Sequence, residues 1–368
     1  MLMQVETFAM KKTNTTYKLY SREKGNLPLP IHYNKDVKGY NGKILSADIG
    51  GTNTRMALFQ VEKGELTLLN EKIFKTKNYS SFPEVLDIFH SETLNDIEAI
   101  CLGVAGPVNE GRVKATNFAW ELDQLELSQI TGVEPVFIIN DMEAHAYGLG
   151  ITTNNNYFEI KKGLDKPGNA AVISPGTGLG EAGLYWNGKT FHPFSTEGGH
   201  CDFSPRNDLD IELMKYLQRE DPHVSWERII SGPGIFNIYN FLKEFRRIDE
   251  PGWFTEKINK ENPAVVISNC SQDGSYTLCK EVIDLFMKFL AVEAAQLSLK
   301  VKATGGVFIG GGIIPHLIPN IKKQEFQKHF INSGPMNRLL SLMSVKVILN
   351  QDTAIYGAAI YAVMNLVK

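Results

Sequence analysis

Residues 44–59 constrain the fold more than any other stretch of the sequence, because two apolar runs there flank a Gly-Gly pair. The second run alternates polar and apolar residues, so the stretch predicts a β-hairpin with the glycines at its tip. Glycine permits positive φ and carries no Cβ, so backbone N–H groups at such a tip can face an anion. The sequence is compatible with an ordinary hairpin or with a cradle for nucleotide phosphates and their Mg²⁺. The candidate phosphate-binding residues are Asp48, Gly50, Gly51, Thr52 and Asn53.

The length of 368 residues exceeds the usual size of one hydrophobic core, so we expect two domains. The net charge is −3, and no Lys/Arg-rich block indicates a nucleic-acid-binding surface. No run of about 18 apolar residues predicts a membrane span, and the N-terminus lacks a signal-peptide pattern. The four cysteines lack CxxC spacing, which favours a reducing compartment over a disulfide framework or a zinc site. We therefore expect a cytoplasmic protein that binds neither nucleic acid nor membrane.

Predicted strands alternate with predicted helices along most of the chain, which is typical of an α/β fold with two sheets. Residues 1–40 show no periodicity and predict an extension, loosely ordered or lying on the surface, whose removal through residue 38 leaves the fold intact. The further predicted strands are 65–74, 99–105, 135–139, 170–174, 181–186, 307–309 and 345–349. The predicted helices are 82–90, 123–130, 142–148, 208–219, 225–230, 234–245, 280–300 and 353–366.

Polar or glycine-rich segments follow three of these strands. Asn140 and Asp141 begin a predicted helix, so they are either helix-capping residues or ligand-binding groups at the carboxyl edge of a sheet. Residues 176–180 suit a phosphate, and residues 310–312 suit a base or ribose lying against the backbone. Together with the hairpin tip, the chain carries three glycine-rich loops at strand ends.

Two further motif matches are not expected to bind nucleotides. Residues 183–190 match the Walker A pattern, and residues 178–183 match the dinucleotide-binding fingerprint. Both patterns require a helix directly after the glycines. A strand with a turn at Asn187-Gly188 is predicted there instead, so both matches belong to a glycine-rich hairpin.

Six stretches together resemble the bacterial-type glucokinases of the hexokinase/actin-like ATPase superfamily, in that family's order over residues 43–365. The Glu-Gly-Gly-His and Ser-Gly-Pro-Gly signatures are the most specific of them. The resemblance implies an α/β chain of two RNase H-like (actin-like ATPase) domains with a central cleft, ATP between them and a sugar in the cleft. It divides the chain into an extension at 1–40, a small domain at 41–140 completed by the helix at 353–368, and a large domain at 141–352. The matching stretches are 48–55, 138–141, 175–180, 197–203, 227–234 and 307–312.

The resemblance also implies a reaction: transfer of the ATP γ-phosphate to the 6-hydroxyl of glucose, the first step of glycolysis, with Mg²⁺ and in a homodimer. Asp141 corresponds to the catalytic base. The cysteine cluster of the zinc-binding repressor/ORF/kinase group is absent, so no zinc is expected. The implied sugar-binding residues are Asn117, Asn140, Asp141, Glu197, His200 and Glu227. The implied ATP-binding residues are Asp48, Gly50, Gly51, Thr52, Asn53, Gly176, Thr177, Gly178, Gly311 and Gly312.

Two alternatives to a glucose kinase stay open on the sequence. One is a kinase for another hexose, such as mannose or an N-acetylhexosamine, because such motifs define the class better than the sugar. The other is a catalytically silent sugar sensor, against which the presence of Asp141 counts. The phosphoryl donor is also open between ATP, ADP and polyphosphate.

Overall fold

The computed structural model describes residues 15–19, 31, 37–90, 96–114, 120–164 and 166–367. The chain forms two compact units, each described here by itself. Unit 1 comprises residues 1–156, 187–195 and 352–368, and unit 2 comprises residues 157–186 and 196–351. Strands and helices alternate through the described residues, so the predicted α/β class is confirmed.

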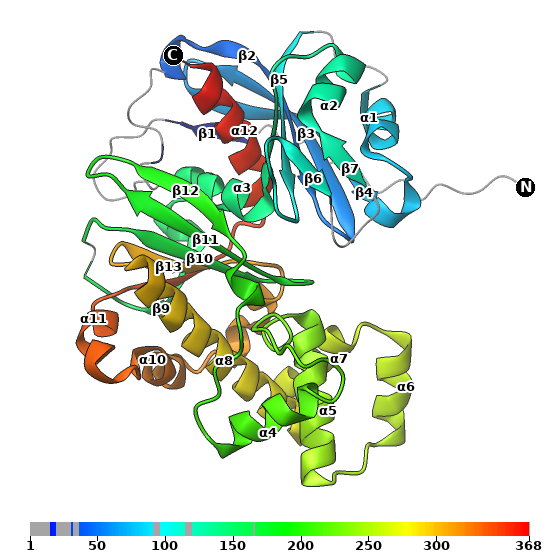
Figure 1. The fold of residues 1–368 in the computed structure, drawn as a ribbon, viewed down its shortest axis with the longest axis vertical. Helices are drawn as coiled ribbons and strands as arrows, with labels where there is room; N and C mark the ends of the chain where they lie inside the picture. Colours follow the sequence, from blue (N-terminus) through cyan, green and yellow to red (C-terminus); the bar gives the residue numbers. More distant parts are fainter. Residues whose placement is uncertain are drawn as a thin grey trace, which may run out of the picture. The chain divides into compact units, whose positions relative to one another are not determined.

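Unit 1 is built on a six-stranded sheet with the order β1-β4-β3-β2-β5-β8 (Figure 1). The predicted hairpin is confirmed, since β2 and β3 pair antiparallel from Asn41↔Glu62 to Ile49↔Thr54. β4 pairs antiparallel with β3, whereas β5 and β8 continue the sheet parallel to β2. The strands are β1 Thr16–Lys18, β2 Asn41–Ile49, β3 Asn53–Glu62, β4 Glu65–Lys75, β5 Ile97–Val104 and β8 Val136–Asn140, with a separate pair β6 Arg112–Lys114 and β7 Glu121–Asp123.

Helices cover both faces of this sheet (Figure 1). Side chains alternate between the faces of a strand, so the neighbours Ile44 and Leu45 enter different cores. Ile44 packs with residues of α3 and α12, and Leu45 packs with residues of α1 and α2. The helices of this unit are α1 Phe82–His90, α2 Gln124–Thr131, α3 Asp141–Gly148 and α12 Thr353–Leu366, with short 3₁₀ helices η1 Val37–Gly39, η2 Thr76–Asn78, η3 Leu149–Ile151 and η4 Asn154–Asn156.

Unit 2 contains most of a second sheet, whose order is β12-β11-β10-β13-β14-β9. Its largest helix, α8, is 25 residues long and packs on β10 and on α5, α7 and α10. The strands are β9 Tyr157–Lys161, β10 Ala170–Pro175, β11 Leu179–Trp186, β12 Phe191–Thr196, β13 Gly306–Ile309 and β14 Val345–Ile348. The helices are α4 Asp208–Leu217, α5 Gly232–Arg246, α6 Gly252–Lys260, α7 Pro263–Asp273, α8 Thr277–Val301, α9 Ile314–Leu317, α10 Lys323–Ile331 and α11 Asn337–Ser341, with 3₁₀ helices η5 Gly198–His200, η6 Ile318–Asn320 and η7 Gly334–Met336.

The two sheets repeat one pattern of pairing. In each sheet, one central strand pairs with its antiparallel hairpin partner on one side and is followed by two parallel strands on the other side. β2 lies between β3 and the parallel pair β5-β8, and β10 lies between β11 and the parallel pair β13-β14. The carboxyl ends of the parallel strands therefore meet at one edge of each sheet.

Part of the segment expected to be an extension, residues 1–40, forms an edge strand of the unit 1 sheet. Residues of β1 pair antiparallel with β4, from Thr16↔Thr67 to Lys18↔Glu65. Leu19 is 7% exposed in the core shared with α12, and the Tyr17 ring meets the Tyr356 ring edge-on at 4.9 Å. Alternation over so few residues is too short to stand out in the sequence.

Two other expectations differ from the structure. Residues 225–230 form turns and not a helix, because the Trp226 and Glu227 amides donate to the carbonyls of Cys201 and Gly199. Unit 1 also extends to residue 156, beyond the expected boundary at 140, because α3 packs along α12. The division into functional domains stays a prediction.

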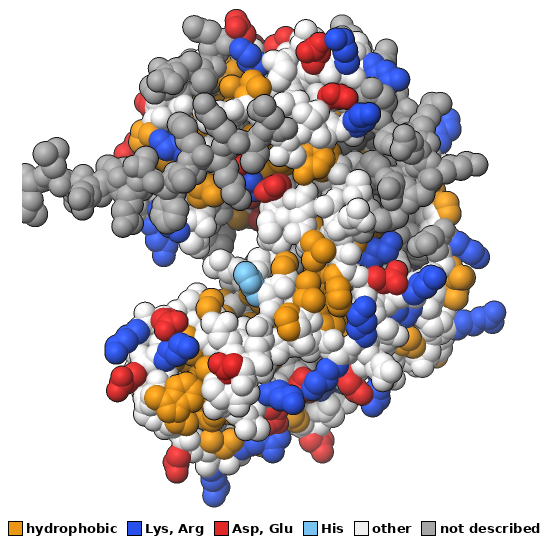
Figure 2. All heavy atoms as spheres, turned by 180° about the vertical axis from the view of Figure 1, so that it is seen from behind, with side chains coloured by type: hydrophobic (Ala, Val, Ile, Leu, Met, Phe, Trp, Pro, Cys, Tyr) orange, Lys and Arg blue, Asp and Glu red, His pale blue; other side chains and the backbone are white. Residues whose placement is uncertain are grey.

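The described surface carries mixed charge. On the face drawn in Figure 2, Lys and Arg side chains lie among Asp and Glu side chains, in keeping with the net charge of −3. No helix in the described part of the chain is long and apolar enough to cross a membrane.

Candidate active site

In unit 1, the sequence-predicted residues lie at one edge of the sheet. β2, β5 and β8 are parallel neighbours, and their last residues are in register as Ile49↔Val104 and Val104↔Asn140. Adjacent strands lie about 4.8 Å apart, so the hairpin tip and Asn140 are separated by about two strand spacings. The structure therefore brings the expected phosphate-binding hairpin and the expected base, Asp141, to the same sheet edge.

The hairpin tip is held from both sides by its own backbone and by the start of η2. The Gly50 N–H donates to the Asn53 carbonyl at 3.0 Å, and the Thr76 hydroxyl donates to the Gly50 carbonyl at 2.7 Å. The Thr76 N–H donates to the Thr52 carbonyl at 3.2 Å, and Lys75 Nζ donates to Asn53 Oδ1 at 2.9 Å. The expectation that the Gly50 amide serves a phosphate is therefore wrong for this structure, because that amide closes the hairpin.

Glycine is also not forced at position 50 by the backbone. Gly50 does not have a positive φ, and the atom nearest to a Cβ built there is the Asn53 carbonyl oxygen at 3.5 Å, an ordinary contact. Thr76 was not singled out from the sequence, since a threonine after a strand carries no motif. Its two hydrogen bonds to the tip were not predictable without the register of β3 and β4.

Asp48 places its carboxylate near the end of β2, opposite Arg55 on β3. Burial raises the pKa of Asp48, and the positive charge of Arg55 partly offsets that shift. Arg55 itself pairs with Glu71 and, at 2.6 Å, with Asp352, so it joins β3 and β4 to the residue before α12.

A carboxylate beside a hairpin that is expected to bind phosphate suits magnesium bound together with a nucleotide. Such Mg²⁺ keeps several waters and takes one or two carboxylates plus substrate phosphates. Within the described residues, no group of three or more His, Cys, Asp or Glu side chains is arranged to hold a metal ion. Asp48 therefore fits the role of a carboxylate for nucleotide-bound Mg²⁺.

Asn140 and Asp141 begin α3. Asn140 is buried and caps the helix, with Oδ1 accepting from the Met142 N–H at 2.9 Å and Nδ2 donating to the Gly106 carbonyl at 3.0 Å. Asp141 occupies the first turn, half-buried, where the helix dipole stabilises a carboxylate. Asp141 Oδ1 also accepts from the Met142 N–H at 2.9 Å, so the helix-cap alternative holds for Asn140 and the Asp141 carboxylate lies beside that cap at the sheet edge.

In unit 2, Glu227 joins two of the predicted loops. Its Oε2 accepts from the Leu179 N–H at 2.9 Å, and its own N–H donates to the Gly199 carbonyl at 2.9 Å. The Ser231 hydroxyl donates to the Glu227 carbonyl at 2.7 Å. The glycine-rich loop after β10 and the turn at residues 197–200 are thus connected through one residue, and the Leu179 amide is not available to a phosphate.

The turn at residues 197–200, called here the sugar turn after its expected ligand, has close neighbours at both of its glycines. A Cβ built at Gly199 would collide with the Leu179 carbonyl oxygen, and one at Gly198 would collide with Glu181 Oε2. The His200 N–H closes the turn by donating to the Glu197 carbonyl at 3.1 Å. The ends of the turn, Glu197 and His200, are exposed.

The third glycine-rich loop lies against the second. The Gly310 N–H donates to the Ile173 carbonyl at 2.8 Å, in line with the parallel pairing of β13 and β10. Gly311 has φ +81°, and a Cβ there would collide with the Pro175 carbonyl oxygen, so both its conformation and its space require glycine. The loop after β10 and the loop after β13 therefore form one glycine-rich surface in unit 2.

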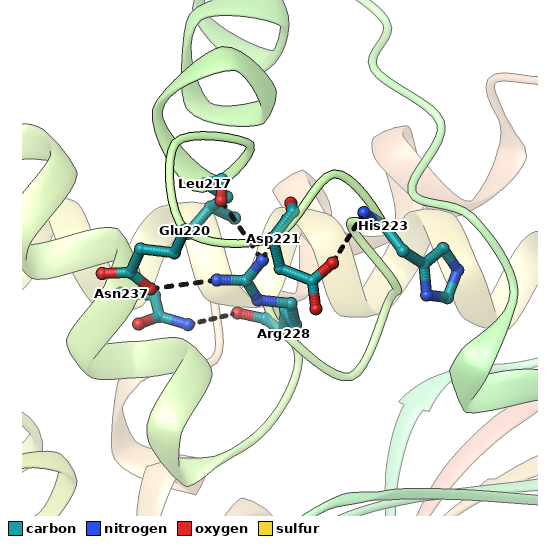
Figure 3. A network of polar contacts seen from close by, with 6 residues as sticks. All are labelled: Leu217, Glu220, Asp221, His223, Arg228 and Asn237. Atoms are coloured by element: carbon teal, nitrogen blue, oxygen red, sulfur yellow. Dashed lines mark hydrogen bonds and ion pairs between the residues drawn. The ribbon is translucent and has the colours of Figure 1, made fainter.

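Arg228, next to Glu227, fixes the position of residues 227–228 through hydrogen bonds to other elements of unit 2 (Figure 3). Its guanidinium donates to the Leu217 carbonyl at 3.2 Å and to Glu220 at 3.1 Å, and its carbonyl accepts from Asn237 Nδ2 at 2.8 Å. These contacts tie residues 217–221 and α5 to the position of Glu227. Arg228 lies within the matching stretch 227–234, but the sequence assigned it no role, because its contacts with residues 217–221 depend on the fold.

The predicted site residues thus fall into two sets. Unit 1 holds the hairpin residues with Asn140 and Asp141, and unit 2 holds the two further glycine loops with the sugar turn and Glu227. Asn117 lies outside the described residues. The two false motif matches are confirmed as such, since β11 and a turn with Gly188 at φ +97° occupy residues 179–188.

Comparison with known proteins identifies the family. A family model described as Glucokinase matches residues 45–365. The glucokinase of a Nostoc species is 32% identical over 336 residues, covering 87% of this chain and 98% of the relative. The glucokinase of Saccharophagus degradans is 35% identical over 318 residues, covering 85% of this chain and 96% of the relative.

Solved structures agree with these relatives. The crystal structure of a glucokinase from an Antarctic psychrotroph has 31% identity and a TM-score of 0.72, and the match covers 87% of this chain and 98% of that one. Residues 1–44, which include β1, precede the segment matched by the family model. The chain belongs to the glucokinase family and is an ATP-dependent hexose kinase.

Proposed function

We propose that this kinase transfers the γ-phosphate of ATP to the 6-hydroxyl of glucose, with Asp141 as the base and with Glu197, His200 and Glu227 binding the sugar. The observation that carries the residue roles is the junction in unit 2, where Glu227 hydrogen-bonds both the phosphate-type loop and the sugar turn. A hexose presents only hydroxyls, so its recognition requires carboxylate, amide and imidazole groups that satisfy them individually. The sugar turn and Glu227 supply such groups.

Asp141 would orient the 6-hydroxyl and accept its proton as the oxygen attacks the γ-phosphorus. A carboxylate with a pKa of about 4 is a weak base, so alignment contributes more than basicity and the proton moves late. Its place in the first turn of α3 puts the carboxylate near the positive end of the helix dipole. The adjacent cap, Asn140, fixes the start of the helix and hence the position of the carboxylate.

The glycine-rich loops would bind the phosphates through those backbone amides that the fold does not itself use. The amides of Gly50 and Leu179 are committed to Asn53 and Glu227, so the donors we propose are those of Gly51, Thr52, Thr177 and Gly178. Lys75, bonded to Asn53, brings a positive charge to the hairpin tip. Asp48 would hold Mg²⁺, which supplies charge neutralisation on the phosphates when it is bound.

A coupled spectrophotometric assay over a panel of sugars and donors tests the proposal. Glucose with ATP should give the highest kcat/KM, ahead of mannose, N-acetylglucosamine and N-acetylmannosamine, and ahead of ADP or polyphosphate as donor. Mass spectrometry of the product should show phosphate on the 6-position. A higher kcat/KM for another hexose would overturn the substrate, and binding of glucose without turnover would identify a sensor.

We also propose that the two units are the two RNase H-like domains of an actin-like kinase, and that the enzyme acts in the cytoplasm as a homodimer. The recurrence of one pairing pattern in both sheets supports the first of these proposals. Light scattering on a size-exclusion column tests the dimer, whose expected mass is twice 41.1 kDa.

A further inference from the structure

Two buried carboxyl groups, those of Glu181 and Glu293, interact with each other next to the sugar turn. Glu181 on β11 is 1% exposed and Glu293 on α8 is 0% exposed. None of the four carboxyl oxygens accepts a hydrogen bond from a described donor group, whereas the two carboxyl groups interact with each other and Glu293 forms an ion pair with Lys300. Two ionised carboxylates would repel in such a place, whereas a pair that shares one proton forms a hydrogen bond.

Glu181 is also in direct contact with the sugar turn. Its Oε2 occupies the space that a Cβ at Gly198 would need. Its backbone carbonyl accepts from the Thr196 hydroxyl at 3.1 Å, and that hydroxyl accepts from the Gly198 N–H at 3.2 Å. The carboxyl pair therefore lies against the segment that ends in Glu197 and His200.

We propose that the Glu181–Glu293 pair positions the sugar turn, and that glucose binding weakens when the pair loses its shared proton. The inference rests on the proposed role of the turn in binding sugar. With one proton, Glu293 donates to Glu181 and the pair stays compact. Without it, the two buried negative charges repel each other, and any displacement of the Glu181 carboxylate changes its contact with Gly198.

The charged groups around the pair support this assignment. Lys300 Nζ lies 3.5 Å from Glu293 Oε1 but is half-exposed, so it compensates one charge and not two. Arg206, before α4, interacts with Glu293 and with Asp210, and Asp210 is already paired with Lys288 at 2.5 Å. The turn itself carries Glu197 and His200. Burial raises the pKa of both glutamates, and repulsion by Glu181 raises the pKa of Glu293 further, which keeps a proton on the pair near neutral pH.

The first test is the pH dependence of the glucose KM. In the parent enzyme, KM for glucose should rise above neutral pH, by at most about tenfold per pH unit for one lost proton. Glu181→Gln or Glu293→Gln leaves at most one charge, so either variant should abolish most of that rise, with kcat and the KM for ATP little changed. Glu256→Gln, an exposed glutamate on α6, is the matched control and should keep the parent profile.

The second test uses the contact with Gly198. Gly198→Ala should raise the glucose KM about tenfold or more, because its Cβ collides with Glu181. Adding Glu181→Ala to Gly198→Ala should restore part of the affinity, because the colliding carboxylate is gone. Two results would overturn the inference. One is a double variant whose effects on the glucose KM are additive, and the other is a pair of glutamine variants whose glucose KM still rises above neutral pH.

The two proposals fail separately. An enzyme that turns over no glucose at pH 7 contradicts the proposed substrate, and the same series is then run with the hexose that is turned over. An active enzyme whose glutamine variants merely lose thermal stability, with the pH profile unchanged, contradicts the positioning role alone.

Discussion

Replacing Leu19 by alanine should lower the free energy of unfolding of unit 1 by about 2–3 kcal/mol. Leu19 follows β1, is 7% exposed and packs in the core formed by β2, β3 and α12. The change removes three buried carbons, worth about 2.4 kcal/mol at about 0.8 kcal/mol for each CH₂. The residual exposure of Leu19 makes the loss of unfolding free energy smaller, and the cavity left by the missing carbons makes it larger. The expected loss therefore lies at the low end of the range for Leu→Ala substitutions in cores.

Urea unfolding followed by circular dichroism measures the change, with Leu69→Ala on β4 as the matched control. Leu69 is 45% exposed, so its replacement should stay within about 0.5 kcal/mol of the parent. Hydrogen exchange gives a local measure, because the Leu68 N–H donates to the Thr15 carbonyl at 3.2 Å. Deleting residues 1–19 should speed exchange in a peptide covering residues 65–75. If Leu19→Ala is as stable as Leu69→Ala and that exchange is unchanged, the strand contributes nothing and the sequence-based expectation of a dispensable extension was right.

Three further predictions concern the site. Asp141→Asn should lower kcat by about 10²–10⁴-fold and leave glucose affinity nearly intact, as measured by steady-state kinetics and calorimetry; turnover within a few-fold of the parent contradicts the base assignment. His200→Ala should lower kcat/KM for glucose by roughly ten- to 200-fold and narrow its advantage over 2-deoxyglucose, because a sugar hydroxyl loses its partner; an unchanged ratio of the two sugars means that His200 does not read that hydroxyl. Gly199→Ala should raise the glucose KM about tenfold or more, since its Cβ meets the Leu179 carbonyl. Gly252→Ala, where no atom lies within 4 Å, is its control and should be silent.

The fold was predictable where the sequence pattern is local. The hairpin of β2 and β3, the strands before each glycine loop and the long helix α8 follow from alternation, helical spacing and turn residues. Residues 225–230 were wrongly predicted as a helix, because some of their amides donate to carbonyls in residues 199–201. The helical spacing of apolar residues does not reveal such a long-range contact. β1 was missed because three residues are too few to show a period.

The sequence predicted where the glycine-rich loops lie, but it did not predict which of their backbone amides are left as hydrogen-bond donors for a ligand. The glycine pattern located the hairpin tip and the loops after β10 and β13, but it did not show that the Gly50 amide closes its own turn. Thr76, Arg228 and Glu181 were missed for a common reason. Each acts on a loop from another element, and only the folded chain brings that element into contact with the loop.

The bonds of Glu227 have a consequence for how any variant of this site is to be interpreted. Its carboxylate accepts from the loop after β10, and its amide holds the sugar turn, so its position is shared by two loops with different proposed ligands. Groups in one hydrogen-bond network do not contribute additively, since removing one changes the geometry of the others. Loss of the Glu227 side chain therefore removes a proposed sugar-binding group and also frees the Leu179 amide, so the KM for ATP should change together with the KM for glucose. Among the described contacts, His200 has no such bond to the loop after β10, so His200→Ala should leave the KM for ATP unchanged. Comparing the KM for ATP of the two variants therefore separates the proposed sugar contact from support of the loop after β10.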